Sequence, residues 1–329
     1  MNDLFGIQNV SLSELQHFGF ESFKKRAFYL TCENMDTIST FYDLCYFGND
    51  KVPFYHCLPL LNTATNNHEY RYMLIDIEDD VVFIAYKVIQ IMTTKQIRVF
   101  DIPVSKKGNL TNSKMVIETL KSKHFVKFAV QKCFLEFYEG LDYNPIEGYN
   151  NYFYSNSILA SLPKRKLRGW RIKNLLDDKD FSFCLCDSID YESIVELRND
   201  FNDYLVERGS KPSAKDDKEF YGLSLLKDKN KKLMPIYYKG NLISLTVFVV
   251  FNDVVYNIYQ MERKHYNCQD ETLDKMLKYN MEEKTKYIAF KLFGRQVERI
   301  YILGAMPNEK RLIAHKERTS DGKIEYFLI

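Results

Sequence analysis

Residues 233–261 read LMPIYYKGNLISLTVFVVFNDVVYNIYQM, three short segments rich in β-branched and aromatic residues. Two turn sequences separate the segments, KGN at 239–241 and ND at 252–253. Gly, Asn and Asp supply the positive φ angles or self-bonding side chains that tight hairpin turns require. The stretch therefore predicts three antiparallel strands joined as a meander.

The chain beyond this meander alternates between helix and strand patterns. Residues 270–293 carry apolar side chains at near-helical spacing and predict an amphipathic helix. An apolar run at 299–305 predicts a buried strand, and 307–318 predicts a helix that begins at Pro307. Residues 324–329 predict a last strand. The predicted order is three antiparallel strands, helix, strand, helix and strand.

That order resembles the C-terminal half of a GNAT acyltransferase. It is similar to the tandem-domain relatives, the Fem-type aminoacyl-tRNA-dependent transferases and the catalytic domain of phosphatidylglycerol lysyltransferases. The ending YILGAMPNEKRLIAHKERTSDGKIEYFLI (301–329) looks like the closing pattern of these proteins, with Lys316 where they carry a Lys. NNYFYSNSILASLPKRKLRGWRIKNLL (150–176) resembles their aromatic strand, turn and basic helix. The resemblance implies an α/β fold of tandem GNAT-like domains, each a mixed, largely antiparallel sheet flanked by helices.

The first half shows the same order of elements. A helix is expected over 11–25 and another near 36–47, then a meander of strands across 69–104. A helix from 111 to about 124 and an apolar strand within 125–137 follow. This repeated order predicts an internal duplication with its boundary in the Pro- and Gly-bearing turn DYNPIEGY. We expect an N-terminal domain over 1–145 and a C-terminal domain with the active site over 146–329.

The composition indicates the class of protein but says little about its function. The chain has 329 residues, of which 46% are hydrophobic and 27% charged, as in globular proteins of one or two domains. Its net charge of +2 favours no partner, and the absence of a long apolar run or a signal peptide predicts a cytoplasmic protein. Abundant Lys, Asn, Ile, Tyr and Phe are typical of AT-rich genomes such as those of phages or low-GC bacteria.

Seven cysteines show no spacing typical of a metal site. Cys184 and Cys186 lie two residues apart in one predicted strand, so both thiols are expected on the same face. Ordinary buried thiols are a simpler interpretation than a zinc site or a disulfide. No metal is expected.

The turn after the third meander strand is where GNAT enzymes bind the diphosphate of their donor. In that family glycines and free backbone N–H groups approach the diphosphate, but no glycine occurs here between Met261 and Phe293. Arg263, Lys264 and His265 are the donor-binding candidates, with a solvated turn as the alternative. The donor implied by the resemblance is acyl-CoA or aminoacyl-tRNA, and the missing glycines leave both open.

Three residues are the catalytic candidates. The resemblance places Lys316 near the acyl carbon, where a cation stabilises the oxyanion; a solvated Lys is the alternative. An amine must be unprotonated when it attacks, so a base such as Glu262, or a water relay, is expected nearby. Tyr256 lies on a strand expected to line the cleft, together with the binding candidates Tyr237 and Tyr259; simple packing is the alternative for these tyrosines.

The basic run KRKLRGWRIK, residues 164–173, is the second binding candidate. Six of its ten residues are Lys or Arg, and it contains the one Trp of the chain. Such a run tracks phosphates while an aromatic ring stacks on a base; the alternative is a solvated helix face. The candidates here are Lys164, Arg165, Arg168, Trp170 and Arg171.

These patterns together predict an enzyme of the GNAT superfamily. It would move an acyl group from a thioester or aminoacyl ester to an amine acceptor, on a phosphate-bearing substrate or a modified nucleobase. The alternative is a non-catalytic tandem GNAT scaffold that binds nucleic acid, either tRNA or DNA, or a protein partner.

Overall fold

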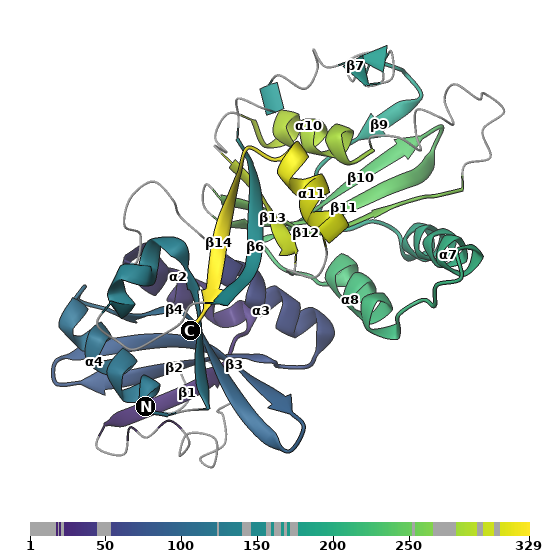
Figure 1. Ribbon diagram of the computed structural model, residues 1–329. Helices are drawn as coiled ribbons and strands as arrows, with labels where there is room; N and C mark the ends of the chain where they lie inside the picture. Colours follow the sequence, from purple (N-terminus) through teal and green to yellow (C-terminus); the bar gives the residue numbers. More distant parts are fainter. Residues whose placement is uncertain are drawn as a thin grey trace. The chain divides into compact units, whose positions relative to one another are not determined.

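The computed structural model divides into two compact units (Figure 1). The first unit contains residues 1–151, 304–318 and 323–329, and the second contains 152–303 and 319–322. The structure describes residues 18, 20, 23–44, 54–123, 125–139, 146–155, 159–160, 166–167, 170–171, 177–251, 254–265, 281–294, 299–305 and 310–329.

The first unit opens with a strand, two helices and an antiparallel meander. These elements are β1 (Lys24–Tyr29), the 3-10 helix η1 (Cys32–Asn34), α2 (Met35–Leu44), α3 (Phe54–Thr65), β2 (Tyr70–Ile77), β3 (Asp80–Ile91) and β4 (Thr94–Ser105). A helix, a strand, a short 3-10 helix and a strand that crosses into the second unit follow, namely α4 (Leu110–Lys121), β5 (Val126–Gln131), η2 (Lys132–Tyr138) and β6 (Ile146–Ser155).

The second unit repeats this plan. Its elements up to the meander are β7 (Lys166–Leu167), β8 (Trp170–Arg171), β9 (Phe181–Phe183), α7 (Tyr191–Glu207), α8 (Ala214–Leu225), β10 (Lys231–Tyr238), β11 (Asn241–Phe251) and β12 (Val254–Glu262). The chain ends with α10 (Met281–Phe293), β13 (Arg299–Ala305), α11 (Lys310–Thr319) and β14 (Gly322–Leu328).

Local sequence explains several of these boundaries. Asn109 caps α4 by accepting hydrogen bonds from the backbone of Thr111 and Asn112. Asp190 and Ser213 cap α7 and α8 in the same way. The β10–β11 hairpin turns through Lys239 and Gly240, which both have positive φ as a type I′ turn requires.

The two units share a parallel pairing of strands after the meander. In the first unit β4 runs parallel to β5, with Ile97 beside Val126. In the second, β12 runs parallel to β13, with Val255 beside Ile300. Each antiparallel meander is thus followed by a helix and a parallel strand, and the expected mixed, largely antiparallel sheets flanked by helices are confirmed.

The last strand of the chain belongs to the sheet of the first unit. The strands of the first unit follow the order β1-β2-β3-β4-β5-β14, and those mainly of the second unit follow the order β13-β12-β11-β10-β9; β6 divides between the two units. β14 pairs antiparallel with β5, with Tyr326 opposite Gln131 and Leu328 opposite Ala129 (yellow in Figure 1). The two compact units therefore do not correspond to a single division of the chain between residues 145 and 146. The domain boundary expected there stays a prediction.

The helix expected over 11–25 needs correction at its end. Lys24 and Lys25 lie in β1, paired with Asp76 and Ile75 of β2, because the apolar residues that follow complete a strand; most of the remaining segment lies outside the described residues. Among the described residues, no helix is long and apolar enough to cross a membrane.

Candidate active site

Each meander contains a β-bulge in its third strand. In the second unit Val247 of β11 pairs with Tyr259 and Phe248 pairs with Asn257, so β12 has one extra residue, Ile258. Bulges redirect side chains and are frequent beside active sites. The end of β12 beyond this bulge is therefore the first place to look for functional groups.

A hydrogen-bonded polar cluster joins this end of β12 to α10. The Gln260 Nε2 group donates to Glu262 Oε1 at 2.9 Å and lies 3.4 Å from Thr285 Oγ1 on α10. Lys264 Nζ donates to the other carboxylate oxygen of Glu262 at 3.2 Å. The predicted base Glu262 thus sits inside a network that holds its carboxylate in place.

Two lysines on α10 are buried beside this cluster. Lys284 and Lys286 are only 3% and 4% exposed, and Thr285 between them is fully buried. Burial lowers the pKa of Lys284 to about 8, although the Glu262 carboxylate opposes this shift. The Lys286 ammonium donates a hydrogen bond to the Tyr154 hydroxyl and lies 3.8 Å from the centre of that ring.

Buried lysines are uncommon, and perturbed ionisable groups concentrate at functional sites. The cluster of Gln260, Glu262, Lys284 and Thr285 is therefore the candidate active site. Glu262 was predicted from the sequence, but the other three were not. A signal was present for Lys284, because it precedes the apolar Ile288 by four residues and so shares its helix face.

The corresponding place in the first unit is filled by structural hydrogen bonds. Asp101 lies at the bulge of β4 with φ of 50°, and its carboxylate accepts from both the backbone and the side chain of Gln131. The Tyr138 hydroxyl donates to the Asp101 carbonyl at 2.7 Å. Since all three residues are buried and bonded to one another, we place the candidate site in the second unit.

The segment after β12 is bound to α7. The backbone N–H groups of Lys264 and His265 both donate to the Asp200 carboxylate. The His265 ring lies 3.3 Å from Asp200 and 2.9 Å from Glu207. A hydrogen bond to Glu207, together with the Asp200 charge, raises the pKa of His265.

These contacts bear on donor binding. The N–H groups of Lys264 and His265 thus face the Asp200 carboxylate, and the N–H group of Arg263 donates to a carbonyl of β11. In this conformation none of the first three N–H groups after β12 is available to a diphosphate. Arg263 lies 3.5 Å from Glu196 of α7, so all three predicted donor-binding residues are engaged by acidic residues. Their role toward a donor stays a prediction, and the residues do not fit the diphosphate-binding arrangement of a CoA enzyme.

The three predicted tyrosines are packed into the second unit. Tyr256 is buried, and its ring stacks on Tyr301 with 5.3 Å between centroids. The ring of Tyr259 lies 5.4 Å from Phe220, and burial raises its pKa to about 12. Burial also raises the pKa of the half-buried Tyr237. These contacts match the packing alternative, and the catalytic or binding roles of the tyrosines stay predictions.

Lys316 lies on α11, a helix that belongs almost entirely to the first unit. Its side chain is half-buried, as is that of Ile313. The helical pattern of 307–318 predicts that Leu312 and Ile313 are buried against the sheet. This prediction is wrong for Leu312, which is 38% exposed. The role of Lys316 toward an oxyanion stays a prediction.

Most of the basic run lies outside the described residues, including Lys164, Arg165 and Arg168. Trp170 and Arg171 form β8, which pairs with Leu167 and Lys166 of β7. The predicted contact of the basic run with phosphates stays a prediction. Within the described parts of the chain, no group of three or more His, Cys, Asp or Glu residues is arranged to hold a metal ion.

Comparison with known proteins gives similarity at the level of structure. No family model and no curated protein sequence match the chain. A conserved protein of unknown function from Bacteroides thetaiotaomicron is 13% identical, with a TM-score of 0.54 and 99% of each chain covered. FemX is 10% identical, with a TM-score of 0.53 over 91% of this chain and 96% of FemX. L-PGS from Bacillus licheniformis is 11% identical, with a TM-score of 0.49 over 89% and 90% of the two chains.

The first two similarities show the fold. Both cover nearly the whole of each chain, so they include the two units together with the crossing strands. The expected tandem, Fem-like GNAT fold is confirmed.

Proposed function

We propose that the protein transfers an acyl or aminoacyl group from an activated ester or thioester to an amine. Its fold is that of FemX, and the second unit holds ionisable groups in its interior. The observation that carries the proposal is the buried Lys284 beside the Glu262–Gln260 network. A buried ammonium is costly and persists where it serves a function.

In the proposed reaction the acceptor nitrogen attacks the carbonyl carbon of the donor. The new N–C bond forms as the C–O or C–S bond to the leaving group breaks, and the acceptor loses a proton. Glu262 accepts this proton and returns it to the leaving oxygen or sulfur. Gln260 and Lys264 fix the carboxylate by their hydrogen bonds.

Lys284 supports this base electrostatically. With a pKa of about 8 it is mostly charged at pH 7, and its ammonium offsets the negative charge of the Glu262 carboxylate beside the reacting groups. Above pH 8 that support is lost. The proposed activity therefore falls on the alkaline side as Lys284 loses its proton.

The contacts of Asp200 favour an aminoacyl ester, such as aminoacyl-tRNA, over a CoA thioester. They occupy the N–H groups of Lys264 and His265, in the segment where CoA enzymes bind a diphosphate. The acceptor amine belongs to a peptide, a lipid headgroup, a tRNA or a modified nucleobase.

A transfer assay tests the proposal. Labelled aminoacyl-tRNA and acetyl-CoA are each incubated with the protein and a panel of amines that includes hydroxylamine as a small acceptor. Glu262→Gln should lower the rate of donor consumption by about 10²- to 10⁴-fold. Glu118→Gln is the control, because Glu118 is an exposed carboxylate on α4 of the first unit.

A non-catalytic scaffold predicts a different result. If neither donor is consumed and neither raises the melting temperature, the protein lacks a donor site under these conditions, since ligand binding to the native state stabilises it. Equal rates for the wild type and Glu262→Gln would instead leave the enzyme standing and remove Glu262 as its base.

A further inference from the structure

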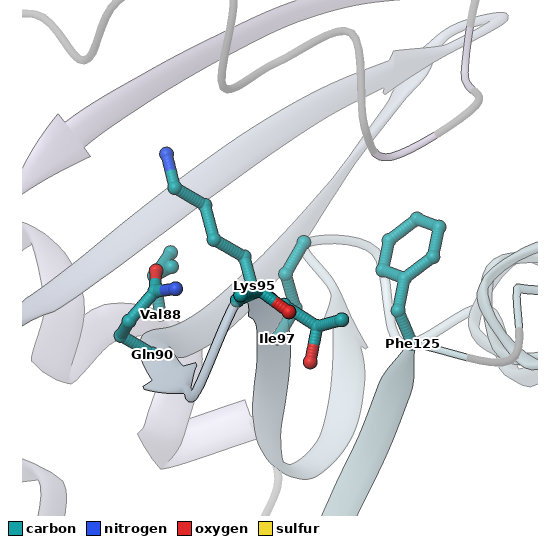
Figure 2. A pocket seen from close by; sticks show the side chains of 7 residues that line it. Val88, Gln90, Lys95, Ile97 and Phe125 are labelled. Carbon is teal, nitrogen blue, oxygen red and sulfur yellow. The ribbon is translucent and has the colours of Figure 1, made fainter.

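The first unit contains a pocket that the proposed function does not use. It lies at the β3–β4 hairpin, has a volume of about 490 Å³, and is lined by Val88, Gln90, Thr93, Thr94, Lys95, Ile97 and Phe125. Figure 2 shows Lys95, Ile97 and Phe125 extending to the same side of the strands. The volume is within the range of small-molecule sites, about 300–1,000 Å³.

The register of the strands produces this arrangement. Val88 pairs with Ile97, and Gln90 pairs with Lys95, so these four side chains lie on one face of the hairpin. The Ile97 N–H group donates to the Phe125 carbonyl at 3.0 Å, which fixes Phe125 beside them. The pocket thus has an apolar base and a polar rim.

The rim is held by its own hydrogen bonds. Thr94 Oγ1 donates to the Ile91 carbonyl at 3.0 Å, and Gln90 Nε2 donates to the Met92 carbonyl at 2.8 Å. These bonds fix a turn whose Met92 has φ of 52°. Ile91 and Met92 are 44% and 94% exposed, so the turn offers apolar surface next to the pocket.

The lining of the pocket carries a single charge, that of Lys95. The Lys95 side chain is exposed and has no ion pair among the described residues. A ligand with an apolar body and one negative group would satisfy both features of the site.

We propose that this pocket binds a small apolar anion, an alkyl or aryl chain that ends in a carboxylate, sulfonate or phosphate group. The chain contacts Val88, Ile97 and Phe125, and the anionic group pairs with Lys95. This site is independent of Glu262 and Lys284, so its test needs no catalytic activity.

The probe is 8-anilinonaphthalene-1-sulfonate, whose fluorescence rises when it enters an apolar site. Lys95→Glu should weaken its binding about tenfold or more, because a charge-assisted contact is lost and replaced by repulsion. Lys114→Glu is the matched control, since it makes the same change of charge at an exposed position on α4. Unchanged circular dichroism melting of both variants shows that the fold is kept.

Competition identifies the ligand class. Dodecanoate below its micelle concentration should displace the probe from the wild type, whereas dodecanol and inorganic phosphate should not. Equal binding by the wild type and Lys95→Glu would overturn the proposal, as would equal displacement by dodecanol or phosphate. Binding to anionic phosphatidylglycerol vesicles without displacement by free dodecanoate would assign the patch to a membrane surface and reject the small ligand.

Discussion

At the residue scale, Lys284 connects the electrostatics of the candidate site to its stability. Its pKa is about 8 in the folded protein and 10.5 in its ordinary state. Between these values the unfolded chain binds more protons than the folded one, so stability rises with pH. The difference corresponds to about 3 kcal/mol over the full range. The ammonium thus destabilises the fold at neutral pH.

Lys284→Met should therefore stabilise the protein at pH 7 while removing the proposed activity. Urea unfolding at pH 7 and pH 10 measures the effect, and the gain over the wild type should shrink as the pH rises. Lys291→Met, a change at an exposed lysine of the same helix, is the control. A variant that is less stable than the wild type at both pH values would show that contacts in the folded protein offset the cost of burying the Lys284 ammonium.

His265 gives the opposite dependence on pH. Its bonds to Glu207 and Asp200 raise its pKa, so its contribution is complete below the unfolded pKa of about 6.5. The contribution is lost as the pH rises through the higher folded value. The groups that face His265 are Lys264, Tyr204 and the carboxylates of Asp200 and Glu207.

His265→Gln should lower the free energy of unfolding at pH 5.5 and leave it nearly unchanged at pH 8.5. Because the imidazole is substantially exposed, solvent screening keeps the effect small. The measurement is urea unfolding of the wild type and the variant at both pH values. The same loss at pH 8.5 as at pH 5.5 would mean that packing, and not charge, holds the segment to α7.

At the element scale, Lys316 on α11 tests the resemblance from which its role was inferred. Lys316→Ala should lower transfer by about 10²- to 10³-fold, because an oxyanion loses one stabilising group. The melting temperature should change little, since the side chain is only half-buried. Transfer is measured with the donor identified in the assay above. Lys310→Ala, at the exposed start of the same helix, is the control, and full activity of Lys316→Ala would remove Lys316 from the mechanism.

Elements with a clear local pattern were predictable, and those that depend on distant contacts were not. The strands β2 to β4 and β10 to β12 are rich in β-branched and aromatic residues and are separated by turn sequences. The sequence therefore predicted them. Helices α3, α7 and α8 were missed; Pro59 inside α3 argues against a helix locally. For α7 and α8, the capping residues Asp190 and Ser213 were the available signal.

The candidate site, like the fold, was predictable only in part. Glu262 follows from the need for a base near the end of a strand. Lys284 was not predicted, since a helix rich in Lys and Glu is usually solvated on those residues. Its burial depends on the tertiary packing of α10 against the strands, which spacing alone does not determine.

At the scale of the whole molecule, the chain returns to its first unit to complete a sheet. Tyr326 of β14 is fully buried, and Ile329 exchanges backbone hydrogen bonds of 2.9 and 3.0 Å with Phe128. Lys132 adds an ion pair to Glu325 at 2.8 Å. Without β14, β5 becomes an edge strand with its backbone groups unpaired. A division of the chain at 145/146 would remove these contacts from the first domain.

We therefore expect deletion of residues 323–329 to destabilise the first unit more than the second. Amide hydrogen exchange should accelerate in β4 and β5, because local opening there loses a pairing strand. The fragment 1–145 should show the same weak protection, and a synthetic peptide of residues 320–329 should restore it in trans. Tyr326→Ala in that peptide should reduce rescue, whereas Lys323→Ala, at an exposed position, should not. If the fragment alone already protects β5 as the full chain does, β14 is an accessory to an independently folding domain.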